Sequence, residues 1–283
     1  MGPTILTMNQ RRGLSVVFGL TFILFTVAIF TQLEEGRVIK VIQHPFKKEH
    51  FSYTGQSTYN DRFKSPSSPN RTSFEAIAIK HGSDKVTFHK YHYMYEKHVR
   101  SLQGKPVKLL EIGLGCNAAL GPGASYYTWL EFLPGVDLYF IENNKRCAEQ
   151  YKSKNANVSI AIGDQADPSF LKEFSDESTK DSLFDVIIDA GGHSMEQQIT
   201  SLEYLWKSVK PGGLYVIEDL HTSYWEDFGG DPSARDTRKH TTMKYVFALL
   251  DDLMAGWTKK SVSHGLESAD CMAQICALRK KTV

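Results

Sequence analysis

Two adjacent carboxylates follow directly after a short apolar run in the second half of the chain. The run 214–217 is β-branched and aromatic, and Glu218 and Asp219 come immediately after it, with His221 and Tyr224 close behind. Such a run predicts a buried strand, and in an open α/β sheet ligands bind beyond the carboxyl ends of the strands. Carboxylates are costly to bury there without partners, such as a metal ion or the donors of a ligand.

Four earlier apolar runs end in the same way, in a glycine or an acid. They span residues 107–112, 136–141, 158–162 and 184–188. Helical candidates alternate with them, at 124–133, 145–154, 168–174 and 196–209. Strands that alternate with helices predict a parallel sheet with helices on both faces. We therefore expect an α/β fold with a doubly wound, mostly parallel sheet.

The remaining composition limits the classes of protein. Charge is nearly balanced, with a formal net charge of +1, which predicts no nucleic-acid partner. We expect a further helix within 237–254 and a closing strand at 272–278. The four cysteines show no metal-site spacing and are interpreted as small buried hydrophobes, while the pairs Cys116–Cys147 and Cys271–Cys276 remain open as disulfides. The oligomeric state cannot be read from the sequence.

The amino terminus differs from the rest of the chain. Residues 14–33 are uncharged and largely apolar, long enough to cross a bilayer as one helix. Arg11 and Arg12 precede this segment, which predicts a cytoplasmic tail at 1–13. A cleaved signal peptide is the alternative. Residues 34–72 are polar and Pro/Ser-rich, which is typical of a stem, so 73–283 would form the globular domain.

This organisation predicts a single-pass type II membrane protein with a lumenal domain, in the Golgi or the ER. Two glycosylation triplets agree with it, at Asn70 and at Asn157, although such triplets often arise by chance. Asn70 is the better acceptor because it lies in the stem, whereas Asn157 begins a predicted strand.

A glycine-containing loop follows the first predicted strand. It reads Glu111-Ile-Gly113-Leu-Gly115-Cys-Asn117, and two glycines let the backbone turn sharply and approach a nucleotide. Glu142, at the end of the second strand, is placed to accept ribose hydroxyls, and its alternative role is that of an acid at a helix N-terminus. After the third strand, Asp164 and Gln165 are candidates for the adenine, and helix capping is the alternative for Asp164.

Taken together, these motifs resemble class I S-adenosylmethionine (SAM)-dependent methyltransferases, a Rossmann-like fold. More specifically, the chain resembles the macrocin and mycinamicin sugar O-methyltransferases from about residue 74 to about residue 230. The matching segments are Gly82-Ser-Asp-Lys85, His89-x-Tyr91, Ile188-Asp-Ala-Gly-Gly-His193 and Tyr215-Val-Ile-Glu-Asp-Leu-His-Thr-Ser-Tyr-Trp225.

The resemblance implies methyl transfer from SAM to a sugar hydroxyl with help from Mg²⁺. It assigns Glu218 and Asp219 as metal ligands and His193 as the base that takes the hydroxyl proton. In that family a second Asp stands where this chain has Ala190. Either one ligand is missing, or Asp189 takes its place as ligand and catalytic group beside the cofactor.

Other residues are assigned with less detail. The resemblance implies that Asp84, His89 and Tyr91 are site candidates, with Asp84 and Tyr91 beside the cofactor. They lie in a segment (82–96) that we expect to form a lid, and an amphipathic helix is the alternative.

His221 and Tyr224 are candidates for binding the acceptor. Packing against the loop is the alternative for both of them, and capping of the following helix is the alternative for His193. For Glu218 and Asp219 the alternative is that of strand-end acids satisfied by Lys or by backbone donors.

The leading hypothesis is therefore a membrane-anchored SAM-dependent O-methyltransferase that modifies a sugar or glycan in the secretory pathway. One alternative is an O-methyltransferase for small secondary metabolites, and another is a non-catalytic lumenal binding protein on the same fold. A NAD-dependent oxidoreductase is disfavoured because the loop after the first strand runs on to Gly123 before a helix pattern begins.

Overall fold

The computed structural model describes residues 71–117, 121–155 and 158–282. The predicted tail, the transmembrane segment and residues 34–70 of the stem lie outside these ranges, as do Asn70 and Asn157. No helix within the described ranges is both long and apolar enough to cross a bilayer. The domain boundaries and the membrane anchor thus stay predictions from the sequence.

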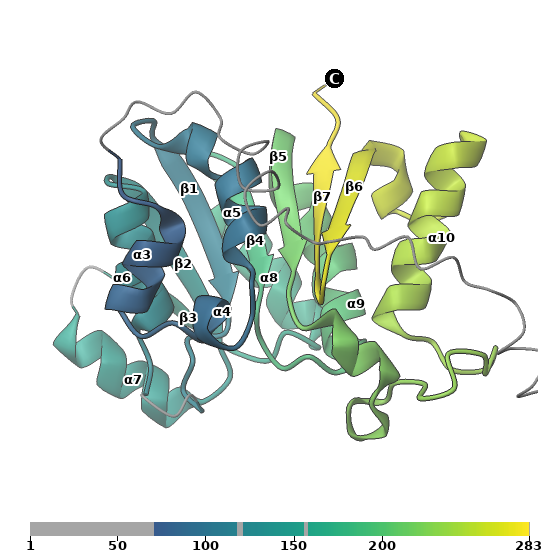
Figure 1. Ribbon diagram of the computed structural model, residues 1–283, viewed down its shortest axis with the longest axis horizontal. Helices are drawn as coiled ribbons and strands as arrows, with labels where there is room; N and C mark the ends of the chain where they lie inside the picture. Colours follow the sequence, from purple (N-terminus) through teal and green to yellow (C-terminus); the bar gives the residue numbers. More distant parts are fainter. Residues whose placement is uncertain (1–70, 118–120, 156–157, 283) are drawn as a thin grey trace, which may run out of the picture. The chain divides into compact units, whose positions relative to one another are not determined.

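A seven-stranded sheet with the order β3-β2-β1-β4-β5-β7-β6 forms the centre of the described chain (Figure 1). The first five strands are parallel, and β7 pairs with β5 and β6 in antiparallel fashion. The strands are β1 (Val107–Ile112), β2 (Val136–Glu142), β3 (Ser159–Ile162), β4 (Phe184–Asp189), β5 (Val209–Ile217), β6 (Leu266–Met272) and β7 (Ile275–Lys280). The mostly parallel α/β fold is confirmed.

Helices cover both faces of the sheet (Figure 1). Successive strand residues point to opposite faces, so Leu109 joins one apolar core and Leu110 the other. The first core also contains residues of α3, α5, α6 and α7, and the second contains residues of α8, α9 and α10. The helices are α3 (Phe74–Lys80), α4 (Asp84–Thr87), α5 (His92–His98), α6 (Ala124–Phe132), α7 (Lys145–Lys154), α8 (Pro168–Ser178), α9 (Met195–Leu205) and α10 (Thr242–Ala255).

Side-chain caps fix where the helices next to the sheet begin. The Asp167 carboxylate accepts hydrogen bonds from two backbone N–H groups at the start of α8. At α9, Ser194 and Gln197 form a reciprocal capping box. Two alternatives raised by the sequence are thereby wrong: the cap of α8 is not Asp164, and the cap of α9 is not His193.

Two predicted elements differ in the structure. Strand β5 begins at Val209, five residues before the predicted run 214–217, so Pro211-Gly212-Gly213 is part of the strand at a register shift. The expected single strand 272–278 is the end of β6, a two-residue turn and most of β7. Both differences arise because pairing with a neighbouring strand decides where a strand starts and ends: β5 pairs with β4, and β6 pairs with β7.

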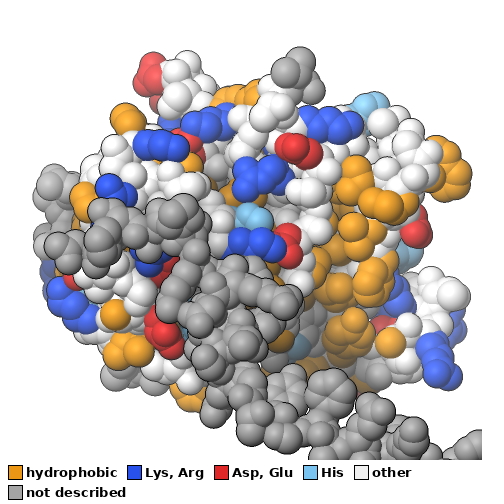
Figure 2. Space-filling model, turned by 45° about the horizontal axis from the view of Figure 1, so that its top comes forward, with side chains coloured by type: hydrophobic (Ala, Val, Ile, Leu, Met, Phe, Trp, Pro, Cys, Tyr) orange, Lys and Arg blue, Asp and Glu red, His pale blue; other side chains and the backbone are white. Residues whose placement is uncertain are grey.

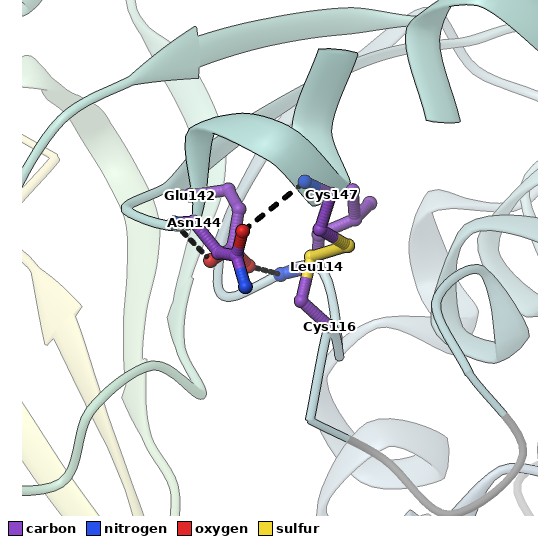
Figure 3. The surroundings of a disulfide bond; sticks show 5 residues. All are labelled: Leu114, Cys116, Glu142, Asn144 and Cys147. Atoms are coloured by element: carbon purple, nitrogen blue, oxygen red, sulfur yellow. Dashed lines mark hydrogen bonds between the residues drawn. A yellow bond between two sulfur atoms is a disulfide. The ribbon is translucent and has the colours of Figure 1, made fainter. Parts of the chain in front are cut away.

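All four cysteines form disulfides, so their interpretation as free buried hydrophobes is wrong. Cys116 lies in the loop after β1, and it is joined to Cys147 in the first turn of α7. Beside this bond, the Glu142 carboxylate accepts hydrogen bonds from the backbone N–H of Leu114 (3.0 Å) and of Asn144 (2.8 Å) (Figure 3). The loop after β1 is therefore tied covalently to α7 and, through the Glu142 carboxylate, to the end of β2.

The second disulfide, Cys271–Cys276, joins residues that face each other across β6 and β7. Between them lies the turn of the hairpin. Because β7 is antiparallel to β5, and Ile217 pairs with Cys276, the tip of this hairpin lies at the carboxyl end of β5 (Figure 1).

Charge is mixed over the surface shown in Figure 2. Lys and Arg side chains are interspersed there with Asp and Glu, and hydrophobic side chains gather toward one side. On this face the basic and acidic side chains thus alternate without forming one continuous basic area.

The two disulfides should differ in their effect on stability. Replacing Cys116 and Cys147 by Ser opens a link across 31 residues, and the free energy of unfolding should fall by about 4 kcal/mol. The matched control, Cys271→Ser with Cys276→Ser, opens a link across only 5 residues and should cost about 2 kcal/mol. Guanidinium unfolding without reductant measures both, and equal losses would contradict the closed-loop argument.

Candidate active site

A cleft opens at the carboxyl ends of β1, β4 and β5, with about 590 Å³ of empty space that is open to solvent. This is the edge of the sheet at which the sequence placed the site. Eight of the predicted site residues line it: Asp84, Tyr91, Glu111, Gly113, Gly115, His193, Glu218 and Asp219. Lys85, His89, Ser125 and Ala190 line it as well.

Other predicted residues lie around the cleft without lining it. They are Asn117, Glu142, Asp164, Gln165, Asp189, His221 and Tyr224. Asn117 and Asp164 are exposed, and one oxygen of Asp164 accepts the backbone N–H of Ala166. The roles assigned to these residues in binding SAM or the acceptor stay predictions.

The glycine turn after β1 forms one wall of the cleft. Gly113 has a φ of 95°, and a Cβ atom there would lie 2.4 Å from the carbonyl oxygen of Ala190. Only glycine fits this close approach between the ends of β1 and β4. The turn therefore keeps bare backbone at the place where a nucleoside could lie against it.

Lys85 lies between two buried carboxylates on the floor of the cleft. Its Nζ is 3.1 Å from Glu111 Oε1 and 2.5 Å from Glu218 Oε2, and all three side chains are almost completely buried. Glu218 also accepts a hydrogen bond from the Tyr95 hydroxyl. Thus α4, α5, β1 and β5 meet at one cation.

The Glu111 carboxylate is saturated by its neighbours. Besides Lys85, it accepts hydrogen bonds from Ser125 Oγ and from Trp129 Nε1 (2.8 Å). A buried carboxylate needs such partners. Glu111 is consequently a structural anchor at the edge of the predicted cofactor site.

One cation is shared by two acids, and this affects their protonation. Burial raises the pKa of Glu218 to about 7, and the nearby Asp219 and Glu111 carboxylates raise it as well, while Lys85 lowers it. The pKa of Lys85 is raised because its two acidic partners outweigh the effect of burial, so Lys85 stays charged. The pKa of Tyr95 lies well above its ordinary value through burial and through Glu218, so its hydroxyl remains a donor.

Asp219 differs from Glu218 because its carboxylate faces the open cleft. Its backbone is left-handed, with a φ of 55°, and the Tyr91 hydroxyl donates to its Oδ1 over 2.9 Å. Three imidazoles surround the carboxylate: His89 Nε2 and His193 Nε2 each at 3.5 Å, and His221 Nδ1 at 3.9 Å. Burial lowers the pKa of His221.

His193 reaches the cleft from the loop before α9. Its φ is 59°, an uncommon conformation for a residue with a side chain, and its Nε2 faces Oδ2 of Asp219. Its Nδ1 is buried, with no hydrogen-bond partner among the residues that the structure describes. The structure thus brings together the predicted base and one of the predicted carboxylates.

Asp189 lies behind the cleft, in the interior. It is completely buried, and its oxygens accept hydrogen bonds from Gln165 Nε2 (3.0 Å) and from Ser201 Oγ. Burial raises the pKa of Asp189. Gln165 also accepts a hydrogen bond from the backbone N–H of Gly192. This placement does not support a catalytic, metal-binding or cofactor-binding role for Asp189, because its partners hold it in the core.

The residues do not complete a magnesium site of the expected kind. Ala190 supplies no oxygen at the position of the missing Asp, and Glu218 is held by Lys85 and Tyr95. Of the expected metal ligands, only the Asp219 carboxylate remains available in the cleft. Within the described ranges, no group of three or more His, Cys, Asp or Glu side chains is arranged to hold a metal ion. Mg²⁺ prefers several oxygen ligands, so we derive no step through a metal.

The predicted acceptor residues lie on the 3₁₀ helix 220–224, after β5. Tyr224 and the neighbouring Trp225 are partly exposed, and His221 meets Trp225 edge to face, with ring centroids 4.5 Å apart. The expected lid, by contrast, is part of the floor: Tyr91, Lys85 and Tyr95 are buried there. The sequence contained signals for Lys85, in the Gly-Ser-Asp-Lys motif, and for Glu111 and Glu218, but it did not show that these three residues pair.

Comparisons with known proteins agree with the site's chemistry, although no family model matches the chain. It is 32% identical over 179 residues to 8-demethyl-8-alpha-L-rhamnosyl tetracenomycin-C 2'-O-methyltransferase of Streptomyces olivaceus. This match covers 62% of this chain and 44% of that protein. It is 36% identical over 163 residues to demethylmacrocin O-methyltransferase of Streptomyces fradiae, covering 56% and 38%. The chain spans less than half the length of these curated relatives.

A solved structure shares the fold. The MycE methyltransferase of the mycinamycin biosynthetic pathway, in complex with Mg and SAH, superposes with a TM-score of 0.65 at 25% identity, over 75% of this chain and 55% of that one. The resemblance inferred from the sequence is therefore confirmed: the chain is a homologue of macrocin- and mycinamicin-type sugar O-methyltransferases, with a class I methyltransferase fold. The ligands of that neighbour are consistent with the expected SAM and possible Mg²⁺.

Loss of the shared cation should destabilise the fold in a pH-dependent way. Lys85→Met leaves two buried carboxylates unpaired, and the free energy of unfolding at neutral pH should fall by about 3–5 kcal/mol. The raised pKa of Glu218, about 7 against an ordinary 4.5, means that its contribution to stability is complete below 4.5 and is lost as the pH rises through 7. Removing the cation raises that pKa further.

The loss caused by Lys85→Met should therefore be smaller at about pH 5 than at about pH 8, because Glu218 is then neutral. Urea unfolding at both pH values measures this difference. Lys85→Met combined with Glu218→Gln should regain part of the stability, since one buried charge is removed. A loss that is equal at both pH values would contradict the shared-cation arrangement.

Proposed function

We propose that this protein is a SAM-dependent O-methyltransferase that transfers a methyl group to a sugar hydroxyl. The observation that carries the proposal is the cleft itself, in which a bare glycine turn faces His193 and Asp219. The homology to sugar O-methyltransferases supports the same reaction.

The glycine turn is suited to SAM because backbone can approach a nucleoside there without side chains intervening. Gly113 and Gly115 line this side of the cleft. When bound, SAM supplies an electrophilic methyl group on a sulfonium centre. The hydroxyl oxygen forms a bond to the methyl carbon, and the carbon–sulfur bond breaks with its electron pair on sulfur, which gives S-adenosylhomocysteine.

His193 is the group that takes the hydroxyl proton in this proposal. A sugar hydroxyl is a weak nucleophile while neutral, so removal of its proton as the bond forms lowers the barrier. The Asp219 carboxylate faces the His193 ring and stabilises the positive charge that forms on it. Tyr91 fixes that carboxylate by donating to one oxygen and accepting from its backbone N–H.

We further propose that the domain lies in the lumen of the secretory pathway, in the Golgi or the ER, behind a single transmembrane anchor. The uncharged segment 14–33 with Arg11 and Arg12 before it supports this orientation. The two disulfides support it as well, because such bonds persist in oxidising compartments.

A second candidate acceptor is a glycosylated small molecule, since the relatives named above act on tetracenomycin and macrocin precursors. Both candidates place a sugar in the same cleft. They differ in where a labelled methyl group appears, either in an organic-soluble extract or on glycoprotein.

His193→Ala should abolish most of the activity without loss of nucleoside binding. With labelled SAM and methyl α-L-rhamnopyranoside, kcat should fall by about 10²–10⁴-fold, the usual contribution of a general base. Calorimetric affinity for S-adenosylhomocysteine should stay unchanged. His240→Ala, an exposed histidine outside the cleft, is the matched control and should retain full activity. Absence of label on every sugar tested with the wild-type chain would overturn the proposed acceptor class.

Chelation of divalent ions should leave turnover nearly intact. Because Ala190 supplies no ligand and Lys85 occupies Glu218, EDTA should change kcat by less than about twofold, whereas Mg²⁺-assisted catalysis would lose far more. The matched variant Ala190→Asp restores a carboxylate at this position and should bind Mn²⁺ more tightly than wild type, as read by electron paramagnetic resonance. A large loss with EDTA that Mg²⁺ reverses would contradict this expectation.

A further inference from the structure

One buried hydroxyl lies between the segments that carry His193 and Asp219. Thr222 follows β5 within the 3₁₀ helix 220–224, and only 2% of it is exposed. Its Oγ1 lies 2.9 Å from the carbonyl oxygen of His193 and 2.9 Å from that of Asp219. A threonine hydroxyl has a single hydrogen to donate, so the two carbonyl oxygens share it. Thr222 therefore joins the end of β5 to the loop after β4.

Both residues that share this hydroxyl have a left-handed backbone. The φ of His193 is 59° and that of Asp219 is 55°. A residue with a side chain adopts this conformation at a cost, and mainly where its surroundings impose it. The shared hydroxyl is such a constraint, since it binds the carbonyl group of each residue, and both residues line the cleft.

The neighbours of His193 in the chain are held by other contacts. The backbone N–H of Gly192 donates to Gln165 Oε1 over 2.8 Å, and Ser194 begins the capping box of α9. Within the described ranges, no donor other than Thr222 reaches the carbonyl oxygen of His193, and Nδ1 of its ring has no hydrogen-bond partner. The imidazole is consequently placed through its backbone.

Asp219 has a second attachment that His193 lacks. The Tyr91 hydroxyl donates to its carboxylate and accepts its backbone N–H. The distance of 3.5 Å between His193 Nε2 and Asp219 Oδ2 thus joins one residue fixed twice to another fixed through Thr222. Loss of the Thr222 hydroxyl should displace His193 more than Asp219. Bulk water does not replace the lost hydrogen bond, because the position is buried.

We propose that Thr222 is a positioning residue: its hydroxyl holds the loop of His193 against the end of β5, so that the imidazole meets the acceptor hydroxyl and the Asp219 carboxylate together. Thr222 acts through His193, since it does not itself line the cleft. This inference rests on the proposed function, in which His193 takes the proton. Roles were predicted for His221 and Tyr224 on either side, but none for Thr222.

Crystal structures of two variants with S-adenosylhomocysteine test the positioning without any turnover. Thr222→Val removes the hydroxyl and keeps a branched side chain, whereas Thr222→Ser keeps the hydroxyl. In Thr222→Val, His193 should leave the left-handed conformation and its Nε2 should move by about 1 Å or more, a displacement large enough to impair catalysis. Thr222→Ser should retain the wild-type position of the ring.

Kinetics test the consequence for methyl transfer. With labelled SAM and methyl α-L-rhamnopyranoside, Thr222→Val should lower kcat by about 10–100-fold, because a base displaced by about 1 Å no longer meets the hydroxyl. The KM for SAM and the calorimetric affinity for S-adenosylhomocysteine should stay unchanged, since the glycine turn is untouched. Thr222→Ser should retain the wild-type kcat.

Thr128→Val is the matched control for the loss of a buried hydroxyl. Thr128 is 1% exposed, and its Oγ1 donates to the carbonyl oxygen of Ala124 within α6 over 2.7 Å. Urea unfolding should show comparable losses of stability in Thr128→Val and Thr222→Val, because each leaves a buried hydrogen bond unmade. Only Thr222→Val should lose kcat. Thr222→Ala, which also removes the hydroxyl, takes the place of Thr222→Val if that variant does not fold.

Each result decides the proposal. An unchanged position of His193 in Thr222→Val overturns it, and so does an equal loss of kcat in Thr222→Val and Thr222→Ser. A loss of kcat in Thr128→Val as large as that in Thr222→Val also overturns it, because general destabilisation then accounts for both. If the wild-type chain methylates no sugar, the proposed function fails, while the crystal structures still decide whether Thr222 holds His193.

Discussion

The cleft depends on Lys85, a buried cation that lies between the buried carboxylates of Glu111 and Glu218. Removing such charges from water is expensive, and the attraction among them repays that cost only where further hydrogen bonds satisfy the remaining oxygens. Here Tyr95 donates to Glu218, and Ser125 and Trp129 donate to Glu111. The arrangement is therefore complete only when α4, α5, α6, β1 and β5 are all in place.

This arrangement divides the work of the two adjacent acids. Glu218 is directed into the protein and joins the floor of the cleft, whereas the left-handed backbone of Asp219 turns its carboxylate toward the opening. Glu218 is structural as a result, whereas the Asp219 carboxylate contacts the histidines of the cleft. The pair therefore does not behave as two equivalent metal ligands, which is what the resemblance alone implied.

Much of the fold could be predicted from the sequence. The five parallel strands followed from short apolar runs that each end in Gly or an acid, and the edge of the sheet that carries the site followed from those endings. The hairpin of β6 and β7 was missed because Ala273 and Gln274 resemble strand residues, and only the antiparallel pairing of β6 with β7 makes them a turn. The disulfides were left open, since cysteine spacing does not reveal which residues the fold brings together.

The site was predicted in part. His193 and Asp219 could be predicted because each belongs to a motif that directly follows a strand. The structure places His193 Nε2 3.5 Å from Asp219 Oδ2. Asp189 was expected beside the cofactor, whereas its bonds to Gln165 and Ser201 hold it in the core, so its assigned roles stay predictions. A Lys partner for Glu218 was one alternative from the sequence, but that this partner is Lys85 could not be foreseen, since the two residues are 133 positions apart in the chain.

The most direct measurement is a crystal structure of the full chain with S-adenosylhomocysteine, grown in the presence of Mg²⁺. The account predicts that Lys85 Nζ remains between Glu111 and Glu218, with the nucleoside along the glycine turn and the Asp219 carboxylate facing the histidines. A magnesium ion bound by Glu218 and Asp219, with Lys85 displaced from both carboxylates, would contradict it.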